Sequence, residues 1–141
     1  AILASDASPM FRKLLDQGLI NDASFSRDYF ECSGYATVMF GGESRDPEAA
    51  AELIRSEVAR LQKEGITEED FRWAKRSLYG ESISALNHAA GIASWVIDFA
   101  FKGMELFTYI DALAGLTLPQ VRQKLETLRD DRSVLSVIWP I

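Results

Sequence analysis

His88 is the side chain of this 141-residue chain best suited by type to hold a metal ion or move a proton, and it is the only histidine. A zinc site on one helix needs two histidines about one turn apart, with a glutamate beside them as general base. Glu81 lies seven residues earlier, two helical turns away, and is at most an incidental partner. We therefore interpret His88 as a partly buried polar residue near a helix break, and predict no metal site.

Cys32 is the only cysteine and could act as a nucleophile if a base such as His88 lay nearby. Nothing in the neighbouring sequence supports that pairing, and a cysteine in an apolar strand is usually a core residue. A single cysteine cannot form an internal disulfide, so its presence favours an intracellular, here cytoplasmic, protein.

The other polar motifs that could do chemistry have simpler interpretations. The segment Gly41-Gly42-Glu43-Ser44 follows a predicted strand, as a phosphate loop does, but it lacks the lysine and the immediate helix of that motif. Asp16, Asp22 and Asp28 stand at expected turn and cap positions, where carboxylates are normally solvated. The sequence therefore predicts no catalytic, cofactor-binding or metal-binding residues in this chain.

The composition is that of an ordinary globular protein, with 48% hydrophobic and 26% charged residues. A net charge of −6 without any basic run argues against nucleic acid as the main partner. No apolar run reaches about 18 residues, so no membrane span is expected. The most apolar stretch, residues 91–101, is too short and contains Asp98.

Residues 8–18 are predicted to form a short helix, because residues typical of helix caps stand at both of its ends. Ser8 can cap the N-terminus, Pro9 suits the first helical position, and Gly18 suits a left-handed C-cap. The apolar face of this helix consists of Met10, Phe11, Leu14 and Leu15.

Strands are expected in two regions. Residues 25–32 and 35–40 flank a Ser33-Gly34 turn signal and can pair as a hairpin. Residues 133–139 are rich in β-branched and apolar side chains and predict a final strand, closed by Pro140.

Helices fill the region between these strands. Asp46 and Pro47 begin one that ends at Gly65, with an apolar stripe that includes Leu53 and Leu61. Further helices are predicted from Thr67 to a break near 87–91, from there to Gly103, over 104–113, and from Thr117 to a break at Asp130-Asp131. By default, we place Trp73, Trp95 and Trp139 in the core.

This element order predicts an α+β fold, with helices packed on one face of an antiparallel or mixed sheet. The three predicted strands make a small sheet, which strands upstream of this chain would complete. We interpret residues 1–141 as a single domain that is a piece of a larger one. The opening Ala1–Ala4 is expected to be the end of an apolar element cut from a longer protein, with processing as the alternative.

The segment Ala7–Leu19 resembles a signature of the second domain of M16 zinc peptidases, the insulinase-like or pitrilysin-like family. Weaker similarities follow in the family's order, at residues 41–48, 65–71, 75–80 and 117–121. The chain thus looks like a bacterial-type C-terminal, non-zinc domain. The resemblance implies part of the metallohydrolase fold of LuxS and the mitochondrial processing peptidase.

In that family the N-terminal domain carries zinc, and the C-terminal domain closes a chamber around an extended peptide. Many C-terminal domains also offer an arginine and a tyrosine that hydrogen-bond the substrate. The matching positions here are Leu14 or Leu15 and Asn21, and Arg12 comes two or three residues too early. We infer that this domain does not supply the pair, which a partner supplies or the protein has lost.

The leading hypothesis is therefore a non-catalytic, peptide-enclosing domain of an M16 zinc metalloendopeptidase, inactive alone. Its expected partners are a zinc-bearing N-terminal domain or an M16 subunit, in a homodimer or heterodimer, and a peptide substrate. Zinc is expected in the missing domain and not in this chain. The alternatives are an inactive scaffold module of the same family and an unrelated α+β domain. If the leading hypothesis holds, apolar surface should be exposed where the absent part packs.

Overall fold

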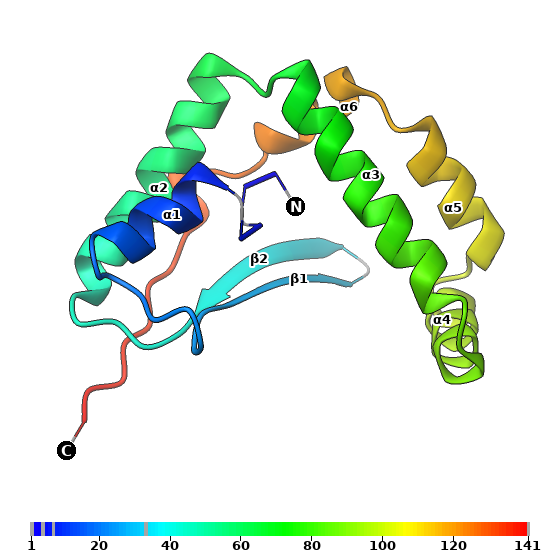
Figure 1. Ribbon diagram of the computed structural model, residues 1–141, viewed down its shortest axis with the longest axis horizontal. Coiled ribbons are helices and arrows are strands. Elements are labelled where there is room, and N and C mark those ends of the chain that lie inside the picture. Colours follow the sequence, from blue (N-terminus) through cyan, green and yellow to red (C-terminus); the bar gives the residue numbers. More distant parts are fainter. Residues whose placement is uncertain (1, 4, 7, 33, 141) are drawn as a thin grey trace. The chain divides into compact units, whose positions relative to one another are not determined.

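The computed structural model of the chain describes residues 2–3, 5–6, 8–32 and 34–140, without the side chain of Cys32. The first residue of the signature segment, Ala7, and the predicted turn residue Ser33 lie outside the described residues, as do Ala1 and Ala4. The chain forms two compact units (Figure 1), one of residues 2–64 with 128–140 and one of residues 65–127.

In the first unit, helix α1 (Pro9–Asp16) has the ends that the sequence predicts. The Ser8 hydroxyl accepts a hydrogen bond from the Phe11 backbone N–H at 3.2 Å, and Pro9 is the first helical residue. At the other end Gly18 has a φ of 65°, in the left-handed region, and the Leu19 N–H donates to the Leu14 carbonyl at 2.9 Å.

Strands β1 (Ser26–Cys32) and β2 (Tyr35–Gly41) form the predicted antiparallel hairpin. Phe40 lies opposite Arg27, and Val38 lies opposite Tyr29. The hairpin is anchored at its open end, where the ring of Phe25 stacks on Phe40 at 6.2 Å and contacts Phe11 at 5.7 Å.

Helix α2 (Pro47–Glu64) begins where Asp46 accepts a hydrogen bond from the Ala49 N–H at 3.0 Å. It packs beside α1 (Figure 1). Met10, Leu14 and Ala50 are buried where the two helices meet. The side chains that pack against these three are only partly buried: Leu3, Leu19, Ile20, Phe25, Phe40, Leu53 and Ile54.

The predicted final strand is wrong. After a short 3-10 helix, η1 (Asp130–Arg132), residues 133–140 are extended but belong to no sheet. A strand needs a neighbour for its backbone groups, and the described sheet contains β1 and β2 only. Val134 and Ile138 are accordingly 92% and 94% exposed.

The second unit begins with α3 (Glu68–Ala85), followed by α4 (Ala89–Phe101) after the predicted break. Thr67 caps α3 by accepting a hydrogen bond from the Asp70 N–H at 3.1 Å. The Asp70 carboxylate accepts from the Thr67 hydroxyl at 2.6 Å, whereas in a capping box it would accept from the Thr67 backbone N–H.

The unit continues with α5 (Leu106–Gly115) and α6 (Leu118–Leu125). The predicted capping box of α6 is present, since the Thr117 N–H donates to the Gln120 side chain at 2.9 Å. However, α6 ends at Leu125, earlier than the break predicted at Asp130-Asp131. The turn that follows is stabilised by the Thr127 hydroxyl, which donates to the Lys124 carbonyl at 2.7 Å.

Aromatic rings from α4 and α5 form much of the core of this unit. Phe99 lies 5.0 Å from Tyr109 and 5.9 Å from Trp95, measured between ring centroids. Placing all three tryptophans in the core was wrong: Trp95 is half-buried, but Trp73 and Trp139 are 50% and 64% exposed. The described residues around these two rings leave about half or more of each side chain exposed.

The architecture is therefore α+β, as predicted, but with a two-stranded antiparallel sheet in place of the expected three strands. Apolar surface is exposed on both units. In residues 65–127 the exposed large apolar side chains include Trp73, Ile92, Val96, Ile97, Phe101, Met104 and Phe107.

Candidate functional site

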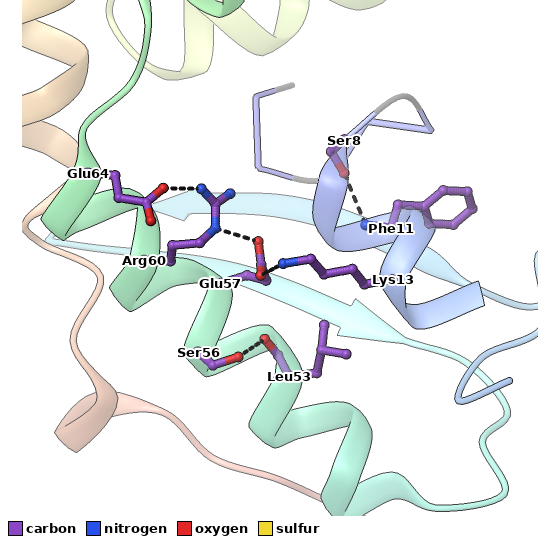
Figure 2. Close-up of polar contacts among 8 residues, drawn as sticks. All are labelled: Ser8, Phe11, Lys13, Leu53, Ser56, Glu57, Arg60 and Glu64. Carbon is purple, nitrogen blue, oxygen red and sulfur yellow. Dashed lines mark hydrogen bonds and ion pairs between the residues drawn. The ribbon is translucent and has the colours of Figure 1, made fainter. Parts of the chain in front are cut away.

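The most unusual polar group of the described structure is the carboxylate of Glu57, which is buried in the middle of α2. Its side chain is 6% exposed and accepts hydrogen bonds from Lys13 of α1 and, at 3.0 Å, from Arg60 Nε. Arg60 also donates to Glu64 at 2.5 Å. Figure 2 shows this network, here called the α1–α2 ion network, running from Lys13 through Glu57 and Arg60 to Glu64.

The charges around Glu57 decide its protonation state. Burial alone raises the pKa of Glu57, but the hydrogen bonds from Lys13 and Arg60 and the charges of both groups together lower it below its usual value. The hydrogen bonds that Arg60 donates, first to Glu64 and then to Glu57, raise the pKa of the arginine. Glu57 therefore stays ionised near neutral pH.

An ionised carboxylate held by two cations is a poor proton donor and a weak base. Lys13 and Glu57 of this network line an open groove of about 510 Å³ between α1 and α2, beside Gln17, Leu53 and Ser56. The Ser56 hydroxyl is itself used, donating to the Leu53 carbonyl at 2.8 Å. The arrangement positions α1 against α2 and offers no nucleophile with an adjacent base.

Sequence reasoning missed Glu57, although the pattern contains a signal. Residues 53, 57 and 61 are spaced four apart and share one helical face, so Glu57 interrupts the stripe defined by Leu53 and Leu61. A carboxylate at such a position needs a cationic partner. Lys13 could not be identified as that partner without the fold, because it lies 44 residues away in the sequence.

His88 is the N-cap residue of α4, but its side chain makes no capping hydrogen bond. The predicted helix break is confirmed, but the side chain is exposed, so the expectation of partial burial was wrong. No part of α3 or α4 folds over this junction to cover it. Glu81 is also exposed and accepts a hydrogen bond from Ser77 at 2.9 Å.

The structure also locates residues 41–44 and the three aspartates for which turn or cap positions were predicted. Gly41 is the last residue of β2, and residues 42–44 follow it without regular structure. Ser44 accepts a hydrogen bond from the Asp46 N–H at 3.1 Å, just before α2 begins. Asp16, Asp22 and Asp28 are all exposed, as expected, and Asp22 lies in a turn. Asp16, however, is the last residue of α1, and Asp28 lies within β1 opposite Met39, so the turn or cap position predicted for Asp28 was wrong. The side chain of Cys32 lies outside the described part, so its predicted core position stays a prediction.

The positions matched to the family's arginine and tyrosine are occupied by residues with structural roles. Leu14 is fully buried in the core, and Leu15 is half-buried beside it. Asn21 forms a turn by accepting a hydrogen bond from the Ala23 N–H at 3.0 Å. Arg12 is exposed on the other side of α1 from Leu14.

Across the described ranges, no three His, Cys, Asp or Glu side chains come together in a way that could hold a metal ion. Over the same residues, no helix is both long and apolar enough to cross a lipid bilayer.

Comparison with known proteins defines the class to which this fold belongs. Residues 1–78 match the family model described as the peptidase M16 inactive domain. The chain belongs to the M16 peptidase family, within its inactive, C-terminal domain.

Two relatives illustrate the similarity. The chain is 30% identical over 139 residues to YmfH of Bacillus subtilis strain 168, described as an uncharacterized zinc protease. It also matches the crystal structure of an M16-like peptidase from Alicyclobacillus acidocaldarius, with a TM-score of 0.77 and 28% identity over 88% of this chain. The chain spans 32% of the length of YmfH and 30% of the crystallised chain.

Proposed function

We propose that this chain is part of the non-catalytic C-terminal domain of an M16-type zinc metalloendopeptidase. In this proposal the domain encloses and binds peptide substrate together with a zinc-bearing domain or subunit outside the chain. The observation that carries the proposal is the match of residues 1–78 to the inactive domain of the family. The whole domain would have the fold of LuxS and the mitochondrial processing peptidase, and the protein would act in the cytoplasm.

The chemistry of the described residues supports a non-catalytic role. The buried carboxylate of Glu57 is neutralised by Lys13 and Arg60, and the lone His88 is exposed at a helix start. Leu14, at a position matched to the substrate-binding arginine, is committed to the core. The contribution of this domain would therefore lie in packing and enclosure, while the zinc-bearing part would supply the reacting groups.

Exposed apolar side chains support a role within a larger assembly. Phe101 and Phe107 of the second unit are 89% and 73% exposed, which is costly in water unless another surface covers them. A domain that closes a chamber needs such a surface.

The test uses the full-length protein that contains this chain. Phe107→Asp places a charge on the exposed apolar surface and is expected to lower peptidase activity at least about tenfold, with zinc content unchanged. Thr108→Asp, on the next and also exposed residue, adds the same charge beside that surface and is the matched control. Unchanged peptidase activity in the Phe107→Asp variant would count against enclosure of the substrate by this surface. If the unsubstituted full-length protein contained no zinc and had no activity, that result would support the scaffold alternative.

A further inference from the structure

We draw no further inference here: the strongest candidate, the exposed apolar face of α4 and α5 that includes Phe101 and Phe107, lies on a chain that spans 32% of the length of its relative YmfH, and nothing in the described residues shows what covers it.

Discussion

Lys13 of α1 and Glu57 of α2 form an ion pair that joins the signature segment of the chain to its first long helix. The glutamate end of the pair is buried and the lysine end is half-exposed. Because Arg60 approaches the same carboxylate from one helical turn further along, Glu57 balances two cations at the point where α1 crosses α2.

Glu57→Gln should destabilise the contact between α1 and α2 by about 1–2 kcal/mol, because the variant leaves two cations without a buried counter-charge. Hydrogen exchange at the amides of α1 should accelerate roughly 5- to 30-fold. Glu64→Gln is the matched control, since Glu64 also pairs with Arg60 but is 58% exposed. Its effect should stay within about 0.5 kcal/mol.

The stability that Glu57 provides should depend on pH. Its pKa is lowered in the folded chain, so the unfolded chain binds the proton more readily. The stabilisation that ionised Glu57 provides is therefore complete above the pKa of the unfolded chain, about 4.5. It is lost as the pH falls through the lower pKa that Glu57 has in the folded chain. The difference in unfolding free energy between the native chain and Glu57→Gln, measured in urea, should be constant from pH 7 to 6 and shrink below pH 4.5. A difference that does not change with pH would contradict this assignment.

Lys75→Met should loosen the second unit. The Lys75 ammonium donates to the carbonyl oxygens of Ala114 at 2.7 Å and Leu116 at 2.8 Å, where α5 ends and its last carbonyls lack helical partners. Removing these hydrogen bonds should cost about 1–2 kcal/mol. Thermal unfolding and exchange at the α5 amides measure the loss. Arg76→Met removes an equal charge from the next, exposed residue and should have little effect.

Two glycine substitutions should have opposite effects. Gly65 ends α2 with a φ of 82°, so Gly65→Ala forces a strained backbone and should destabilise by about 1 kcal/mol. Gly80 lies inside α3, and a β-carbon there meets nothing within 4 Å. Gly80→Ala should therefore stabilise by about 0.5–1 kcal/mol. Urea midpoints of the two variants should move in opposite directions, and a shift in the same direction would contradict this account of the two sites.

The sequence predicted best those features that neighbouring residues determine. Ser8, Asp46 and Thr67 cap helices as expected, because a cap hydrogen bond spans only three residues. The hairpin was predictable for the same reason, since the two strands are adjacent in the chain.

Features that depend on distant partners were missed. Residues 133–139 have the composition of a strand, yet a strand forms only where another strand can accept its backbone hydrogen bonds. The exposure of Trp73 and Trp139 likewise depends on what packs over each ring. The role of Glu57 required knowing that α1 brings Lys13 beside it.

We propose that this chain belongs to the non-catalytic part of a zinc peptidase. Zinc content and peptidase activity, measured for the full-length protein beside the isolated 141-residue chain, test it most directly. We expect about one zinc ion and peptide hydrolysis in the full-length protein, and neither in the isolated chain. Zinc binding and peptide hydrolysis by the isolated chain would contradict the claim that this part is non-catalytic. If the full-length protein had no zinc and no peptidase activity, the scaffold alternative would hold instead.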